Sequence, residues 1–227
     1  MVPASVGLAA EYAAMDDIPF RGSQALKRGA VTRSALRTRY RAVFRDVYIA
    51  KDANLTAAAK ARAAWLSTGA TLGGLSAAAV LGTKWLDAAA PAEIVRADRH
   101  GQRGIVVHSY QLADDEVQTC RGMRVTTAAR TAFDIGRGLP VVRAVPILDA
   151  LLNATGIKPA DVVALTDRHP GARGVRRLRA ALELADGGAE SPQETRVRLL
   201  LVGAGLPKPE TQIEFRDLRI RVDMGMA

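Results

Sequence analysis

Residues 21–51 read RGSQALKRGAVTRSALRTRYRAVFRDVYIAK, and this stretch decides how the front of the chain folds. A short helical pattern ends at Gly29, and Thr32 stands where the N-cap of a second helix is expected. Apolar residues then alternate with polar ones over residues 41–49, on both sides of Asp46. A helix, a tight turn, a second helix and a strand pair, in this order, predict a winged helix-turn-helix.

The same stretch concentrates the positive charge of the chain. The whole protein carries a formal charge of +9, from 32 Lys and Arg against 23 Asp and Glu. Residues 21–51 hold nine of the basic residues and one acid, so they carry +8 and the rest of the chain only +1. Such a concentrated patch favours a polyanionic partner, which we expect to be double-stranded DNA. The predicted DNA contacts are Lys27, Arg28, Arg33, Arg37, Arg39, Arg41 and Arg45.

Two of these cations define the expected contact helix. Arg33 and Arg37 are four residues apart, so they share one face of the second helix, where they can reach phosphates and guanine edges. Arg41 and Arg45 fall on the expected wing, within reach of the backbone or the minor groove. The competing interpretation is a solvated basic face on a small helical subdomain.

The composition limits the other functions that the chain can have. Aromatic residues make up 4%, too few for a platform that stacks single-stranded bases. Cys120 is the only cysteine, which excludes an intrachain disulfide and a cysteine-based metal cluster. The three histidines, at 100, 108 and 169, lack the spacing of metal ligands, and no phosphate loop, nucleophile elbow or dinucleotide fingerprint is present. We find no signal peptide or apolar run of membrane-spanning length, so we expect a cytoplasmic protein without a membrane partner.

The middle of the chain predicts a mixed α/β region with no assigned chemistry. Helices are expected at 55–67 and 75–86, and strands at 92–97 and 104–110, joined as a hairpin by Asp98–Arg103. Further on, Thr127 caps a helix in which Arg130 and Asp134 form a bracing ion pair. Two tryptophans are expected as core anchors, Trp65 and Trp85.

Residues 189–227 read AESPQETRVRLLLVGAGLPKPETQIEFRDLRIRVDMGMA. Ser191 followed by Glu194 forms a capping box, and Gly205 with Pro207 stops the helix. The apolar face of this helix is expected at Val197, Leu200, Leu201 and Ala204. Two short alternating runs then predict a hairpin that ends at Asp223.

Two parts of the chain resemble known families. Leu26–Gly29, Thr32–Leu36 and Asp46–Ile49 resemble the N-terminal DNA-binding domain of AbiEi-type antitoxins, and the run Val-Thr-Thr-x-x-Arg-Thr-x-x-Asp-Ile at 125–135 resembles another element of that family. The tail, with Glu-Ser-Pro-x-Glu-x-Arg-x-Arg and Arg-Val-Asp, resembles the opening of the very-short-patch-repair-type endonuclease domain, which often ends larger actinobacterial proteins with antitoxin-like front halves.

The second resemblance implies a catalytic role for two carboxylates, Glu194 and Asp223. In that family a third strand supplies a further acidic residue and its partner, and the sequence stops before such a strand. Two carboxylates supply too few oxygens for a catalytic Mg²⁺ site, so we expect an incomplete remnant with no cofactor and no metal unless the site is completed.

These observations predict an α/β (α+β) protein in three parts. Residues 1–54 form a winged helix-turn-helix DNA-binding domain, 55–186 a mixed α/β antitoxin-like region, and 187–227 an incomplete segment of the restriction-endonuclease-like fold. The expected function is an antitoxin-like transcriptional regulator that binds double-stranded DNA, with an inactive nuclease-like tail. Two alternatives stay open, a very-short-patch-repair-type endonuclease (or its remnant) and a protein that neutralises a cognate toxin by direct contact.

Overall fold

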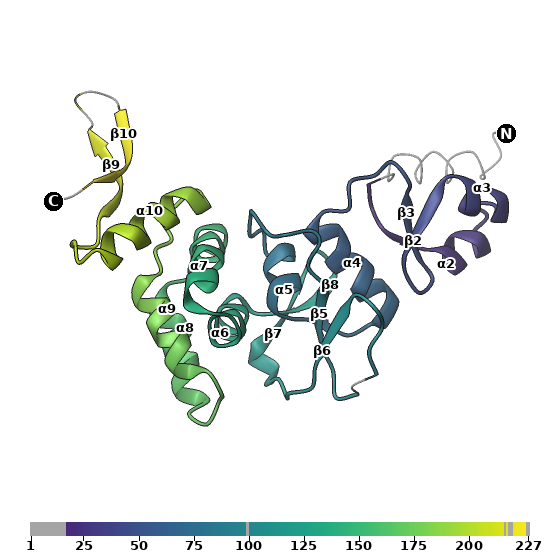
Figure 1. The fold of residues 1–227 in the computed structure, drawn as a ribbon. Coiled ribbons are helices and arrows are strands. Elements are labelled where there is room, and N and C mark those ends of the chain that lie inside the picture. Colours follow the sequence, from purple (N-terminus) through teal and green to yellow (C-terminus); the bar gives the residue numbers. More distant parts are fainter. Residues whose placement is uncertain (1–16, 99, 216, 218–219, 226–227) are drawn as a thin grey trace. The chain divides into compact units, whose positions relative to one another are not determined.

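A computed structural model describes residues 17–98, 100–215, 217 and 220–225 (Figure 1). The chain forms two compact units. The first comprises the described residues up to Val80 together with Asp87–Val125. The second comprises Leu81–Leu86 together with the described residues from Thr126 onward. The mixed α/β class predicted from the sequence is confirmed.

The first unit begins with the predicted winged helix-turn-helix. Thr32 Oγ1 accepts a hydrogen bond from the Ala35 N–H (3.1 Å) and so caps the second helix, while Gly29 takes a φ of +69° at the end of the first. The strands form a three-stranded sheet in the order β1-β3-β2, with both pairings antiparallel. The elements are β1 (Phe20–Arg21), α2 (Gly22–Lys27), α3 (Arg33–Thr38), β2 (Tyr40–Phe44) and β3 (Val47–Ala50).

A small apolar core holds these elements together. Leu36 of α3 and Ile49 of β3 are buried in it, and Phe20 meets the ring of Tyr40 edge-on with ring centroids 5.0 Å apart. Leu55 and Ala59 pack against the same core, so the start of the next helix closes it. The strand β1 lies outside the stretch in which the sequence predicts strands, because two residues are too few to show an alternating pattern.

The rest of the first unit is a five-stranded mixed sheet in the order β6-β5-β4-β8-β7. Its strands are β4 (Thr71–Leu72), β5 (Ala92–Val95), β6 (Ile105–His108), β7 (Val117–Cys120) and β8 (Met123–Thr126), with a 3-10 turn, η1 (Asp114–Glu116), before β7. The strand β4 pairs antiparallel with β5 and parallel with β8.

The expected hairpin between β5 and β6 is wrong. The two strands pair in parallel, from Ala92 opposite Ile105 to Val95 opposite His108. Strand β6 therefore begins at the same end of the sheet as β5. The alternation of apolar residues reveals which face of a strand is buried but says nothing about its direction, which explains the error.

Two helices of small residues pack beside this sheet, α4 (Ala57–Thr68) and α5 (Gly74–Val80). Several alanines on both helices are fully buried, which lets the helices approach closely. Helix α5 ends at Val80, six residues before the predicted end at Leu86. Gly82 and Trp85 have φ values of +100° and +63°, which no right-handed helix accommodates. Trp85 is 66% exposed, so it is not the expected core anchor.

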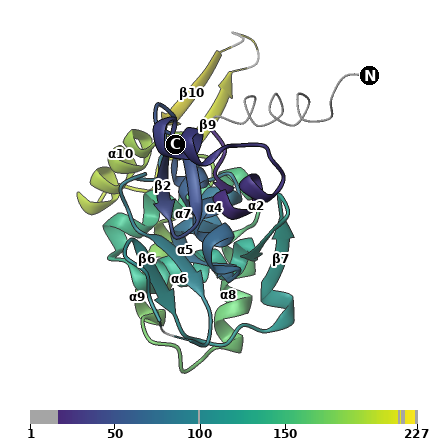
Figure 2. The ribbon, with the colours of Figure 1, turned by 90° about the vertical axis from the view of Figure 1, so that its right-hand side faces the viewer.

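The second unit is mainly helical. Its elements are α6 (Ala128–Gly138), α7 (Val141–Thr155), α8 (Pro159–Arg168), α9 (Val175–Leu184), α10 (Pro192–Gly203), β9 (Glu210–Phe215) and β10 (Ile220–Gly225). Helix α6 packs against both α8 and α9, whose labels lie to either side of it in Figure 2. The strands β9 and β10 form an antiparallel hairpin of their own. Among the described helices, none combines the length and apolar character needed to cross a membrane.

The predicted ion pair on α6 is confirmed, and a second arginine, Arg137, joins it. Arg130 Nε lies 2.9 Å from Asp134 Oδ2, and Arg137 Nη2 lies 2.7 Å from Asp134 Oδ1. Both guanidinium groups also lie over the ring of Phe133, at 5.5 and 5.3 Å from its centroid. Arg130 and Asp134 are almost fully buried, so this cluster braces the helix inside the unit.

Candidate nucleic-acid interface

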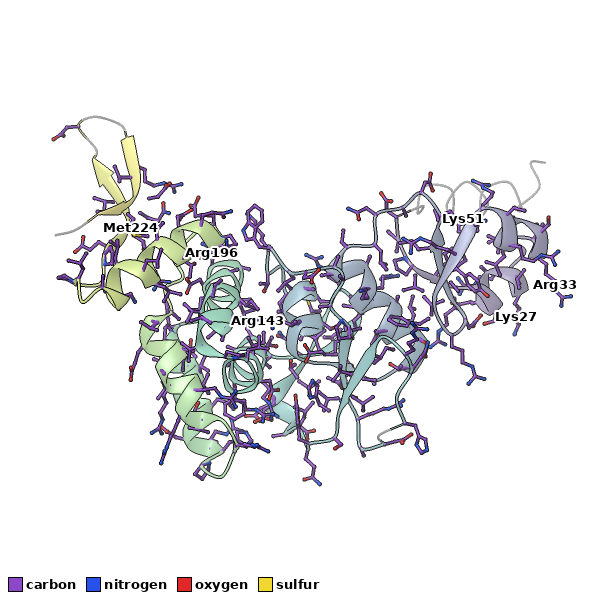
Figure 3. The ribbon with its side chains drawn as sticks, viewed as in Figure 1. Lys27, Arg33, Lys51, Arg143, Arg196 and Met224 are labelled. Carbon is purple, nitrogen blue, oxygen red and sulfur yellow. The ribbon has the colours of Figure 1, made fainter. Side chains whose placement is uncertain are left out.

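The candidate site is the basic surface of the winged helix. Lys27 and Arg28 are exposed at the end of α2, and Arg33, Arg37 and Arg39 are exposed on and just after α3. Figure 3 shows Lys27 and Arg33 projecting away from the ribbon. Within the described residues, none of these five cations forms an ion pair with a carboxylate. They are therefore available to a polyanion.

Local chemistry fixes the orientation of α3. Leu36 points into the core, while the side chains of Arg33 and Arg37 are exposed on the flank of the same helix. The carbonyl of Arg37 accepts a hydrogen bond from Lys51 Nζ (3.1 Å), which links the end of α3 to the residue directly after β3. Arg39 lies over the ring of Tyr40, 6.0 Å from its centroid. The backbone of the helix is thus anchored while its arginines stay in solvent.

The one acid of this stretch, Asp46, turns towards the fold. Its Oδ1 accepts the N–H of Ser23 (2.8 Å), its Oδ2 accepts the hydroxyl of Ser23, and its carbonyl accepts the N–H of Gly22 (2.9 Å). A carboxylate at the first turn of α2 satisfies free N–H groups and complements the helix dipole. Asp46 therefore serves the start of α2, and none of these bonds involves α3.

The wing carries two arginines in different settings. Arg41 is half-buried, and its Nη2 donates to the carbonyl of Ala53 (3.1 Å), so part of its hydrogen-bonding capacity supports the fold. Arg45 is exposed at the turn between β2 and β3. The seven predicted DNA contacts thus lie on one winged helix, and their role in binding remains a prediction.

A depression of about 1110 Å³ lies beside the wing. Strand β2, helix α4, Arg96 and residues 100–105 contribute to its lining, and its cations are Arg41, Arg45, Lys60, Arg96 and Arg103. Lys60 is held by the carbonyl of Ala90 (3.0 Å). Sequence reasoning missed Lys60, Arg96 and Arg103 because they are scattered among residues of a charge-balanced region, and only the fold brings them beside the wing.

One acid also lies near this depression. The N–H of His100 donates to Asp98 Oδ1 (2.9 Å), and this bond, followed by the bond from the His100 ring, lowers the pKa of Asp98 below its ordinary value. Asp98 is therefore ionised at neutral pH.

The predicted catalytic carboxylates have separate surroundings in the second unit. Glu194 accepts the N–H of Glu190 (2.9 Å) at one oxygen and the hydroxyl of Ser191 (2.6 Å) at the other, so both oxygens are engaged at the start of α10. Ser191 caps the helix as predicted, but the N–H that Glu194 accepts is that of Glu190 and not of Ser191, so the predicted capping box is only half formed. Asp223 is exposed on β10. In the described ranges no three His, Cys, Asp or Glu side chains gather as metal ligands. The catalytic assignment of Glu194 and Asp223 stays a prediction.

Arg198 of the tail motif and its neighbour Thr195 bind the buried carboxylate of Asp149, and we call this cluster the clamp. It was not predicted from the sequence. The guanidinium of Arg198 pairs with the carboxylate of Asp149 on α7, and the two side chains are 0% and 1% exposed. The hydroxyl of Thr195 donates to Asp149 Oδ2 (2.7 Å), and the N–H of Asp186 donates to Oδ1 (2.7 Å). Burial raises the pKa of Asp149, and these three donors oppose that rise.

The clamp inverts the expected orientation of α10. Arg198 and Thr195 face the unit, whereas Val197 and Leu200, expected on the buried face, are 50% and 73% exposed. Apolar spacing misled here because a buried carboxylate on another helix attracts polar residues to the inner face. The only signal in the sequence is the position of Thr195 and Arg198, three residues apart and thus on one face.

The fold and the surface together define a class, an α/β protein headed by a winged helix-turn-helix with unpaired cations on its second helix. The comparisons with known proteins then give the family. Residues 62–184, more than half of the chain, match the AbiEi antitoxin C-terminal domain, and this chain belongs to that family. The resemblance to the antitoxin family is confirmed over this range, which includes the run at 125–135. The resemblance of residues 26–49 to the family's N-terminal DNA-binding domain lies outside the match and stays a prediction. The match ends at Leu184, before the tail, so the nuclease resemblance stays a prediction.

Two relatives come from strains of Mycobacterium tuberculosis and are described as uncharacterized proteins. Each is 35% identical to this chain over 109 residues, which cover 48% of this chain and 40% of the relative. The match thus spans about two fifths of the length of these curated relatives.

Proposed function

We propose that this protein is an antitoxin-like transcriptional regulator that binds double-stranded DNA through α3 and the wing. The observation that carries the proposal is the division of charge on the winged helix. Five cations on and beside α2 and α3 face solvent without an ion-pair partner in the described residues, while the one acid of the stretch is engaged at the start of α2. Membership of the AbiEi antitoxin family supports the regulatory role and a cognate toxin as the second partner.

The mechanism follows from the placement of the arginines. A helix of this width fits the major groove, where Arg33 and Arg37 would contact phosphates or guanine edges from one face. Arg45 at the tip of the wing would reach the adjacent backbone. The depression lined by Arg96 and Arg103 would extend the attractive field beside the wing.

The test is a fluorescence-anisotropy titration of duplex DNA against the wild type and Arg33→Ala/Arg37→Ala, repeated at several salt concentrations. We expect the double variant to lose about 2 kcal/mol of binding free energy, roughly thirty-fold in Kd. The slope of log K against log salt is negative, and its magnitude should decrease by about 2, since two phosphate contacts are lost. An unchanged affinity in the folded double variant would overturn the proposal.

The matched control is Arg143→Ala/Arg196→Ala. Both arginines are exposed on helices of the second unit, α7 and α10, and they are labelled in Figure 3. This variant loses two positive charges, as the test variant does. A difference in DNA affinity between the two variants therefore depends on where the arginines lie and not on net charge. We expect the control to bind DNA with nearly the wild-type affinity.

We further propose that the nuclease-like tail is inactive in this chain. Support comes from Glu194, whose two carboxylate oxygens are engaged at the start of α10. A carboxylate that already accepts two hydrogen bonds has fewer lone pairs for a metal ion, and Mg²⁺ needs near-octahedral oxygen coordination.

A further inference from the structure

We infer that the outer edge of β10, which pairs with no other strand within the described residues, pairs with β10 of a second copy of this chain in an antiparallel strand dimer. The hairpin is the starting point. It is a two-stranded sheet within the described residues, and a sheet of this size has unpaired backbone groups along both outer edges (Figure 2). These groups are a template for another strand.

The two edges are not equivalent. On β9, Thr211 Oγ1 lies 3.2 Å from Asp186 Oδ2, and Thr211 also lies close to Gly188, so this strand is fastened to the segment before α10. On β10, Arg221, Val222 and Asp223 are all exposed. One surface ion pair reaches this strand, between Arg221 and Glu190 (3.1 Å), and both of its members are about half exposed. An exposed pair of this kind contributes about 0–1 kcal/mol, so it is easily exchanged.

The sequence of β10 is complementary to itself. Arg221 and Asp223 flank Val222 symmetrically and share one face of the strand, because side chains alternate between faces. When two copies pair antiparallel about Val222, each Arg221 lies opposite the second copy's Asp223. Parallel pairing in register would instead place like charges opposite each other, which is destabilising. The charge pattern therefore selects a two-fold, isologous contact with another copy.

The other face of β10, which carries Val222 and Met224, also favours the antiparallel pairing of two copies. Val222 lies opposite Ile213 in the hairpin, and Met224 lies opposite Thr211. In the dimer the two Val222 side chains would meet at the two-fold axis and continue this apolar face across the new strand pair. A contact of a few residues buries less than the roughly 1,200 Å² of a stable interface, so we expect a dimer of micromolar affinity.

The test is sedimentation velocity of the full chain over a range of micromolar concentrations. We expect a concentration-dependent dimer for the wild type. Arg221→Asp or Asp223→Arg alone should abolish it, because each places like charges opposite each other. The double swap Arg221→Asp/Asp223→Arg should restore it. Mixing the two single variants should also give a dimer, since Asp and Arg again face each other.

Two controls keep the test specific. Arg196→Asp reverses the same charge on an exposed position of α10 and should leave the dimer intact. In a Cys120→Ser background, Val222→Cys should form an intermolecular disulfide on mild oxidation, because the paired positions bring its thiols together. The exposed Glu210→Cys, on the other strand, should not. A chain that stays monomeric would overturn the inference, and so would a dimer unaffected by either single charge change.

Discussion

The winged helix and α10 use arginine in opposite ways. On α3, Leu36 packs inside and Arg33 and Arg37 stay in solvent. On α10, Arg198 is fully buried against Asp149 while Val197 and Leu200 face solvent. The difference shows that an arginine-rich helix is not by itself a DNA-binding surface. An arginine on such a helix turns inward when a buried carboxylate lies within reach of it. The position of that carboxylate is known only from the folded structure.

The largest effect should come from breaking the clamp. Removing one partner of a buried ion pair leaves an unpaired charge inside the protein, so Arg198→Ala should lower the free energy of unfolding by about 3–5 kcal/mol. Urea denaturation measures this loss. The exposed neighbour Arg196→Ala should change stability by no more than about 0.5 kcal/mol. A loss below about 1 kcal/mol for Arg198→Ala would show that the clamp is not a structural anchor.

A double variant sharpens this result. Asp149→Ala/Arg198→Ala removes both buried charges, so it should be less unstable than the sum of the two single changes. Additive losses would contradict the close contact of the two side chains.

A smaller effect should follow from Asp46→Ala in the winged helix. The change removes the acceptor of the Ser23 N–H at the start of α2, so we expect a loss of about 1 kcal/mol in unfolding free energy. DNA affinity per folded molecule should not fall, because the variant also loses the one negative charge of the basic stretch. Thermal unfolding and the anisotropy titration measure the two effects. A weaker affinity in folded protein would mean that Asp46 orders the contact surface directly.

The smallest effect should be found at the predicted nuclease residues. Wild-type protein incubated with Mg²⁺ or Mn²⁺ and supercoiled plasmid should nick no more than Glu194→Ala/Asp223→Ala, since both carboxylate oxygens of Glu194 are engaged at the start of α10. Agarose-gel electrophoresis separates the nicked form. Metal-dependent cleavage that disappears in the double variant would restore the endonuclease hypothesis.

Features set by neighbours in the chain could be predicted from the sequence. The N-caps at Thr32, Thr127 and Ser191 are found as expected, and so is the pair of Arg130 with Asp134. Each depends on residues three or four positions apart, where the geometry of a helix leaves little choice. The basic surface could be found for a similar reason, because its cations lie close together in one short stretch of the sequence.

Features set by distant partners could not be predicted. Asp149 and Arg198 are 49 residues apart, and the sequence around either residue contains no signal that identifies the other as its partner. Strand β6 runs parallel to β5, and the pattern of apolar residues does not reveal the relative direction of two strands. The outward position of Trp85 follows from backbone angles after α5 that a tryptophan rarely adopts.

The central place of β4 has a consequence for the order of folding. This strand of two residues lies in the middle of the five-stranded sheet, and one of its neighbours, β8, pairs with it through Leu72 and Val125. The sheet therefore cannot be completed until a loop of more than fifty residues has closed, which is slow compared with local contacts. The winged helix has all its strand partners by Ala50. During synthesis, which proceeds from the N-terminus, the basic head can thus form while the antitoxin-family region is still an open chain.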